Sequence, residues 1–381
     1  MAKRAANNMG TVRQRSDGRW EGRYTASDGK QHSVYALTQE ACTAALRASM
    51  SEVDDGSWRE PSKLTVSEWL DIWLKDYQTE TSERTINKYK SIAKHFKKSI
   101  GTIKLTKLAP IHVRRMVKDM ENDGLKASSI DNYCRIFRTA MNRAVEARII
   151  KENPADNVKL PKPINRQFVI IDREEIPLFL NEIKKTPYEN EYTVMLLTGM
   201  RIGEVRGLKW SDIDFKTGTV HVQRQLQPKN KSLQRFTLPK YKEIRLLHVA
   251  QEVIDALKDQ RRKQAEQRLA AGDKWYEDDI TTDLVFRKPN GKPHARGSLD
   301  RPLKKVGEAI GKPDIRPHDL RHSYAVAALR SGASVKSVQH NMGHKSSRMT
   351  LDTYAKYTDD AGKIDAIKLS NYLKENASTA N

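Results

Sequence analysis

The sequence is poor in cysteine and contains no long apolar run. Its two cysteines, Cys42 and Cys134, lie far apart in the 381 residues, which argues against a disulfide framework and against a zinc site built on cysteine. No stretch of about 18 apolar residues occurs, and the N-terminus has no apolar segment of the signal-peptide type. We therefore expect a cytoplasmic protein that does not enter a membrane.

Acidic residues are scarce relative to basic ones. The 48 Asp and Glu are outnumbered by 69 Lys and Arg, so the net charge is +21. An excess of this size favours a polyanionic partner such as nucleic acid. No cluster of carboxylates at metal-ligand spacing stands out, and we expect neither a metal nor another cofactor. The length allows two or three domains with at least one sizeable core.

Residues 1–56 carry three strand-like runs separated by Asp-Gly turns. Asp-Gly between such runs is a strong hairpin signal, so we predict a three-stranded antiparallel sheet followed by a helix that Thr38 caps. Basic and aromatic side chains of this small domain are candidates for contact with DNA phosphates in a groove. The alternative is that the aromatics pack the small core and the arginines are solvated. The candidates are Arg13, Arg15, Trp20 and Arg23.

Residues 62–160 have the apolar spacing of amphipathic helices. Stripes such as Val66, Trp69, Leu70 and Trp73 recur along this region and predict a bundle of four or five helices. Basic residues on the opposite faces are candidate DNA contacts, although lysines on a helix face are commonly only solvated. These residues are Lys90, Lys94, Lys97, Arg135 and Arg138.

Residues 166–381 contain two motifs rich in basic residues. The first, Thr-Gly-Met-Arg-Ile-Gly-Glu at 198–204, is a helix start punctuated by glycine. The second is His-x-x-Arg at 318–321, followed by Met-Gly-His at 342–344 and by Tyr354. His-x-x-Arg alone is weak evidence, because it often marks an exposed helix face. Both motifs, in this order, resemble the signature boxes of the tyrosine recombinases, also called the phage integrase family.

The residue types suit phosphodiester chemistry without a metal. Cleavage requires cations against the non-bridging oxygens, an in-line nucleophile and a proton for the leaving oxygen. Guanidinium groups bind phosphate oxygens in a fork and keep their charge, so Arg201 and Arg321 are candidates for a phosphate clamp. Tyr354 would attack phosphorus, and the cationic surroundings would lower the free-energy cost of its phenolate.

The resemblance implies a role for each matching residue. Two arginines would clamp the phosphate, one histidine would assist proton transfer at the nucleophile, and a lysine would be the general acid for the leaving 5′-oxygen. A second histidine would bind the scissile phosphate, and Glu204 would support the first arginine. The two arginines are Arg201 and Arg321, the first histidine is His318 and the lysine is Lys240. The second histidine is His344, and the nucleophile is Tyr354.

Several assignments have rivals. The segment around Lys240 departs from the family's more common Lys-Thr pattern, so other lysines compete for the acid role, and Tyr357 competes with Tyr354. We interpret His322 and His340 as packing or capping residues and Tyr324 as a core residue. The competing lysines are Lys229, Lys231 and Lys242.

The resemblance also implies the architecture and the partners. We expect a mainly helical, multidomain protein: an arm-type DNA-binding domain (1–56), a helical, SAM-like core-binding domain (62–160) and a mixed α/β catalytic domain (166–381). Four copies would assemble on double-stranded DNA and recombine it through a Holliday junction, with residues 361–373 as a helix exchanged between copies or covering their own domain. An excisionase or a host DNA-bending protein is a candidate accessory partner.

The function implied is integration and excision of a temperate phage or a conjugative transposon. Two alternatives remain. A type IB topoisomerase would share the chemistry but relax supercoils without recombinant products. A non-catalytic DNA-binding regulator would have no need for a tyrosine placed after two phosphate-binding arginines.

Overall fold

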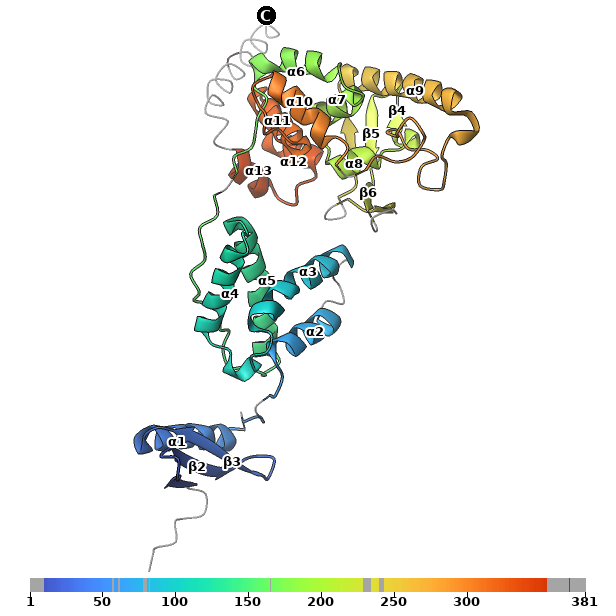
Figure 1. Cartoon of the computed structure of the whole chain (residues 1–381). Coiled ribbons are helices and arrows are strands. Elements are labelled where there is room, and N and C mark those ends of the chain that lie inside the picture. Colours follow the sequence, from blue (N-terminus) through green and yellow to red (C-terminus); the bar gives the residue numbers. More distant parts are fainter. Residues whose placement is uncertain are drawn as a thin grey trace, which may run out of the picture. The chain divides into compact units, whose positions relative to one another are not determined.

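The computed structural model describes residues 10–56, 58–60, 62–77, 81, 83–164, 166–228, 234–239, 243–295, 297–354 and 370. The chain divides into two compact units, Met1–Asn165 and Arg166–Asn381, and each is described by itself. None of the helices within the described ranges is long and apolar enough to cross a membrane. Figure 1 shows the chain with most of its helices and strands labelled.

The first unit begins with the predicted three-stranded antiparallel sheet. Its order is β1-β2-β3, and a helix follows whose cap, Thr38, accepts a hydrogen bond from the backbone N–H of Ala41. The glycines of the two Asp-Gly turns, Gly18 and Gly29, have φ of 82° and 74°, the left-handed conformation that these tight turns require. The elements are β1 (Thr11–Gln14), β2 (Trp20–Thr25), β3 (Gln31–Ala36) and α1 (Gln39–Asp54).

Helix α1 packs on one face of this sheet because Gly22 in the central strand leaves room for it. A Cβ at Gly22 would lie 3.3 Å from the Cys42 sulfur and 3.3 Å from Cβ of Leu46, both on α1. Tyr24 and Trp58 complete this core, and the Trp58 indole donates a 3.0 Å hydrogen bond to the Tyr24 hydroxyl. The other face of the sheet is left to polar side chains.

Four helices form the rest of the first unit. Successive turns of each contribute apolar side chains to one core around Trp69, Trp73 and Phe137, as the helical spacing predicted. A reciprocal capping box between Thr65 and Glu68 begins the first of them. They are α2 (Val66–Asp76), α3 (Glu83–Ile100), α4 (Pro110–Asn122) and α5 (Ala127–Glu146).

The second unit is mixed, with helices around small antiparallel sheets (Figure 1). The first sheet has the order β4-β5-β8, and β6 pairs with β7 separately. The strands are β4 (Ile213–Asp214), β5 (Thr219–Val222), β6 (Gln225–Pro228), β7 (Gln234–Thr237) and β8 (Arg245–His248). The helices are α6 (Ile176–Ile183), α7 (Glu189–Thr198), α8 (Ile202–Arg206), α9 (Gln251–Ala271), α10 (Asp300–Ala309), α11 (Pro317–Arg330), α12 (Val335–Met342) and α13 (Ser347–Tyr354).

Two details of the second unit concern how its extended segments pair. Leu284 is joined to Lys209 by an isolated bridge, and the carbonyls of Leu284 and Val285 accept hydrogen bonds from the side chain of Gln264 on α9. The segments on either side of residues 240–242 belong to different sheets, since β7 pairs with β6 and β8 pairs with β5.

Helix α7 is central to the second unit because it packs against both α9 and α11. It ends at Gly199, whose φ of 65° turns the chain abruptly into Arg201, the N-cap of α8. The ring of Tyr324, on α11, covers this turn, and a Cβ at Gly199 would lie 2.3 Å from Cδ1 of that ring. The turn that presents Arg201 therefore requires glycine for its conformation and for its contact.

Replacing Gly199 by alanine is expected to destabilise the second unit strongly. The left-handed backbone alone costs about 1–2 kcal/mol with a Cβ, and the overlap with Tyr324 adds about 1–3 kcal/mol. Urea unfolding of the full chain measures the loss. Gly311→Ala is the control, because Gly311 has φ of 72° with open space around it and should cost only the backbone term. Equal losses for the two variants would contradict the contact with Tyr324.

Candidate active site

Three arginines surround the C-terminal end of α12. The carbonyl oxygens of Asn341, Met342 and Gly343 each accept a hydrogen bond from a different guanidinium, at 2.8, 2.6 and 2.7 Å. The donors, in that order, are Arg245, Arg321 and Arg201. Because the last carbonyls of a helix have no partner within it and carry partial negative charge, they are natural partners for cations.

The three arginines come from different elements that the core fixes. Arg201 stands at the N-cap of α8, Arg245 opens β8, and Arg321 lies in the middle of α11. Arg321 also donates a 2.5 Å hydrogen bond to the carbonyl of Gly199, the turn that precedes Arg201. The two predicted phosphate-clamping arginines are thus tied to the same turn of backbone.

Glu204 is the carboxylate of this group, and its side chain is completely buried. It accepts a 2.8 Å hydrogen bond from the Arg201 guanidinium and a 2.7 Å one from that of Arg245. Burial by itself would raise the pKa of Glu204, but the hydrogen bond and charge of Arg245, aided by Arg201, outweigh it and lower that pKa. Glu204 is therefore ionised and bridges the two arginines.

The site retains an excess of positive charge. Burial, with the nearby charge of Arg201, lowers the pKa of Arg321 to about 9, which still leaves the group protonated at neutral pH. Three guanidinium groups face one carboxylate among these residues, and Arg201 keeps 15% of its side chain exposed. Such an arrangement favours binding of an anion, and guanidinium forks suit a phosphate best.

His344 follows directly after this end of α12. Gly343 makes the connecting left-handed turn, with φ of 60°, and Nδ1 of His344 lies 2.9 Å from the Thr350 hydroxyl. Burial and the charge of Arg321 lower the pKa of His344 to about 3. The ring is accordingly neutral at physiological pH and is a hydrogen-bonding group rather than a cation.

Tyr354 ends α13 with only 1% of its surface exposed. Its hydroxyl lies 2.6 Å from Nδ1 of His322, whose ring stacks on Phe168 at 3.8 Å between centroids. His318 lies edge-on to His322, with ring centroids 4.8 Å apart. Burial, and the charge of His318, lower the pKa of His322 to about 4, so its neutral ring can accept the phenolic proton.

The structure thus brings together most of the candidate catalytic residues. Arg201, Glu204, Arg321 and His344 surround the end of α12, and His318 reaches Tyr354 through the ring of His322. Candidate Lys240 lies outside the described residues, as do its rivals Lys229, Lys231 and Lys242, the rival nucleophile Tyr357 and residues 361–369 and 371–373 of the predicted exchanged helix.

Two contacts escaped the sequence analysis. Arg245 was not considered, although it occupies the same face of β8 as the buried Leu247 and so was due to point inward. His322 was interpreted as packing or capping. It does pack on Phe168, but its bond to Tyr354 joins residues 32 positions apart and left no local signal. Tyr324, expected in the core, is partly buried there and accepts a hydrogen bond from Asn341.

In the first unit, three of the candidate DNA-binding residues share the open face of the β1-β2-β3 sheet. Arg13 and Arg23 bond to the buried carboxylate of Glu21, at 2.7 and 3.2 Å, and Arg15 lies 3.9 Å from it. Hydrogen bonds from Arg23 and Arg13 lower the pKa of Glu21 to about 2. Trp20 is separated from this group, because strand alternation turns it to the α1 side.

The candidates in the helical part of the first unit differ among themselves. Lys90, Lys94 and Lys97 line one hollow of about 370 Å³, in which Lys97 pairs with Asp71 at 2.6 Å. Arg135 is exposed and pairs with Asp131. Arg138 donates to the backbone carbonyls of Ala155 and Val158 and so holds the following segment in place.

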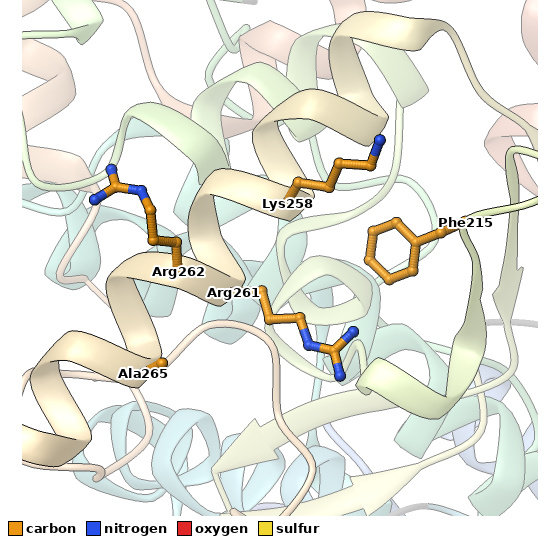
Figure 2. Close-up of a pocket in the computed structure, with 5 residues that line it drawn as sticks. All are labelled: Phe215, Lys258, Arg261, Arg262 and Ala265. Atoms are coloured by element: carbon orange, nitrogen blue, oxygen red, sulfur yellow. The ribbon is translucent and has the colours of Figure 1, made fainter.

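A further hollow, of about 510 Å³, lies along α9 (Figure 2). Phe215, Lys258, Arg261, Arg262 and Ala265 line it, and none of the candidate catalytic residues that the structure describes does. In Figure 2 the side chain of Arg262 extends away from Phe215, and it pairs with Asp259 and Glu266. This hollow is separate from the arginine group at the end of α12.

Comparison with known proteins gives the same picture for both units. Residues 170–360 match the model of the phage integrase family, and residues 65–121 match that of the phage integrase N-terminal SAM-like domain. The chain is 24% identical to the XerC-like tyrosine recombinase of Caldanaerobacter subterraneus subsp. tengcongensis, over 89% of this chain and 91% of the relative. It is 24% identical to the transposase from transposon Tn916 of Enterococcus faecalis, over 97% and 98%.

Solved structures confirm the fold class. The integrase of transposon Tn1549, bound to a circular intermediate DNA, has a TM-score of 0.69 at 20% identity, covering 80% of this chain and 99% of that one. A lambda integrase tetramer bound to a Holliday junction has a TM-score of 0.57 at 17% identity, covering 94% and 97%. At these identities the likeness concerns the fold.

The lowered pKa values of His322 and His344 make the second unit less stable in acid. In the unfolded chain each ring takes up a proton near its ordinary pKa of 6.5, whereas in the folded chain it does so near pH 4 and pH 3. Their contribution to stability is therefore present above pH 6.5 and is lost as the pH falls toward these values. We expect the melting temperature to drop between pH 7 and pH 5.

The variant His322→Asn, which lacks a titrating ring, should show a smaller drop over that range, measured by thermal denaturation at both pH values. The exposed His221 on β5 provides the control, since His221→Asn should leave the drop unchanged. An identical drop in the wild type and in His322→Asn would contradict this assignment.

Proposed function

The chain belongs to the phage integrase family of tyrosine recombinases, which makes it a site-specific DNA recombinase, and we propose that Tyr354 is its nucleophile and Arg201 and Arg321 its phosphate clamp. The observation that carries the proposal is the convergence of these arginines, with His344 beside them, on the end of α12. A non-bridging phosphate oxygen at this place would face two fixed guanidinium groups.

The cleavage step balances without a metal or a nucleotide. The phenolic oxygen of Tyr354 attacks phosphorus, a bond to the 3′-phosphate forms, and the bond to the 5′-oxygen breaks. The phenolic proton passes to a base, for which His322 is hydrogen-bonded and His318 lies next in line, while Lys240 protonates the 5′-oxygen. The phosphotyrosine ester conserves the energy of the broken bond, so a second 5′-hydroxyl reseals the strand by the reverse step.

Tyr354 must move before it attacks. Its hydroxyl is bonded to His322, and 1% of the residue is exposed, so no phosphate of a duplex can reach it in this conformation. Tyr354 ends α13, and displacement of this helix would free the phenol while the arginines stay bound to α12. We infer that the free protein is in an uncleaving state and that assembly on DNA releases the tyrosine.

Assembly involves both units. The solved relatives include an integrase bound to transposon DNA and a tetramer bound to a Holliday junction. By analogy we propose that four copies of this chain act on two DNA sites, with the arginine face of the β1-β2-β3 sheet and the hollow containing Lys90, Lys94 and Lys97 contacting phosphates. The element moved is a phage or a conjugative transposon.

The nucleophile is tested with a suicide substrate: nicked DNA from the end of the element, incubated with protein in EDTA. Wild-type protein is expected to form an adduct that survives SDS, and Tyr354→Phe should form none while binding the DNA equally well. Tyr357→Phe is the matched control and should keep the adduct. An adduct with Tyr354→Phe that disappears in Tyr357→Phe would transfer the role to Tyr357.

The same reaction separates the alternatives. With two intact sites, a recombinase yields recombinant products, whereas a topoisomerase would only relax supercoiled DNA. No adduct from the wild type on a verified site would leave a DNA-binding protein without catalysis.

Binding by the sheet face is tested through salt dependence. Each phosphate contact contributes about 0.9 to the slope of log affinity against log salt concentration, so Arg13→Gln with Arg23→Gln should lower the slope by about 2. Fluorescence anisotropy with a duplex from the element's end measures it. Arg47→Gln, which changes an exposed residue of α1, is the control and should leave the slope as in the wild type. An unchanged slope in the double variant would show that Arg13 and Arg23 do not contact DNA phosphates.

A further inference from the structure

Arg245 is an arginine that cannot reach DNA in this structure. Only 2% of its side chain is exposed, against 15% for Arg201. It alternates with exposed Leu246 and shares the inward face of β8 with Leu247. Removing a guanidinium from water is costly unless its donors form hydrogen bonds. A buried arginine therefore indicates that its surroundings need a positive charge, which a neutral side chain would not supply.

Its donors are directed at two parts of the active site. NH2 donates to Glu204 at 2.7 Å, NH1 lies 3.3 Å from the other oxygen of the same carboxylate, and Nε donates to the carbonyl of Asn341 at 2.8 Å. The fork holds both oxygens of Glu204, one of which also accepts from the Arg201 guanidinium, and Nε holds the first of the three carbonyls at the end of α12. One side chain thus fixes the partner of Arg201 and the helix end that Arg201 itself contacts.

We propose that Arg245 is a positioning residue of the cleavage reaction, which orients Arg201 toward the scissile phosphate through Glu204 and through the turn at Gly343. This inference rests on the proposed function. Arg245 does not touch DNA. It acts by holding the carboxylate and the helix end against which the phosphate-binding guanidinium is aligned.

The charges explain why an arginine is needed at this position. Glu204 is completely buried and would favour its neutral form without a strong cationic partner, and a neutral carboxyl would hold Arg201 weakly. Arg201 cannot supply this alone, because its charge must remain available to the phosphate. Arg245 keeps Glu204 ionised, so Arg201 can interact with an ionised carboxylate and with an incoming phosphate at the same time.

Gly343 shows how closely the turn is fitted to this pair. A Cβ at Gly343 would lie 3.0 Å from NH1 of Arg245 and 3.4 Å from NH1 of Arg201, and its φ of 60° disfavours any other residue. The turn that leads into His344 is therefore packed closely against both guanidinium groups. Loss of Arg245 would open space under it and loosen Arg201 and His344 together.

The experiment compares full-length Arg245→Gln and Arg245→Lys with wild type on two suicide substrates. One carries the normal phosphate at the scissile position, and the other carries a methylphosphonate, in which a neutral methyl group replaces one charged oxygen. We expect Arg245→Gln to slow adduct formation with the phosphate substrate by about 100-fold, because a small displacement of a catalytic group has an effect of this size. Its affinity for DNA should stay unchanged. Arg245→Lys keeps the charge without the fork and should lose on the order of tenfold.

The methylphosphonate separates positioning from general damage. A substrate lacking the charge depends less on Arg201, so Arg245→Gln should approach the wild-type rate on it, within about tenfold. Arg262→Gln, an exposed ion-paired arginine of α9, is the matched control and should match wild type on both substrates. Thermal denaturation verifies that each variant is folded, and if Arg245→Gln fails to fold, Arg245→Lys is compared on the two substrates in its place.

Two results would overturn the proposal: a folded Arg245→Gln that cleaves the phosphate at the wild-type rate, or equal losses on both substrates, which would make Arg245 merely structural. Both results can be told apart from failure of the proposed function. If the proposed function failed, wild-type protein would form no adduct, or would form one that Tyr354→Phe retains.

Discussion

The proposed active site depends on hydrogen bonds between three arginines and three successive carbonyls at the end of α12. Guanidinium groups repel one another, and here they are brought close because the helix end offers each a partially negative partner. Glu204 neutralises part of the remaining charge. The cations are therefore in place before any DNA arrives, which is the condition under which electrostatic stabilisation of a transition state is most effective.

The first unit shows the same arrangement on a face that we propose to bind DNA. On the open face of the β1-β2-β3 sheet a single buried carboxylate, Glu21, gathers the side chains of Arg13 and Arg23. Long basic side chains lose rotamer freedom when they bind phosphate, and a shared carboxylate removes part of that loss in advance. In both units a buried glutamate orders arginines that we propose to bind phosphate.

Much of this was predictable from the sequence because it is local. The Asp-Gly turns, the helical spacing around Trp69 and Trp73 and the boxes around Arg201 and Arg321 identify the sheet, the bundle and most of the arginine group. Arg245 and the bond of His322 to Tyr354 were not found, because each depends on contacts between distant segments.

The burial of Tyr354 has a consequence for the host genome. A protein of net charge +21 meets every chromosomal sequence by electrostatic attraction, and most of those encounters are with the wrong site. The proposed nucleophile is held against His322 with 1% exposure, which leaves such encounters without a broken strand. Selectivity for the correct site then rests on how tightly DNA is held and also on whether the complex supplies the free energy to extract the tyrosine, a second checkpoint after recognition.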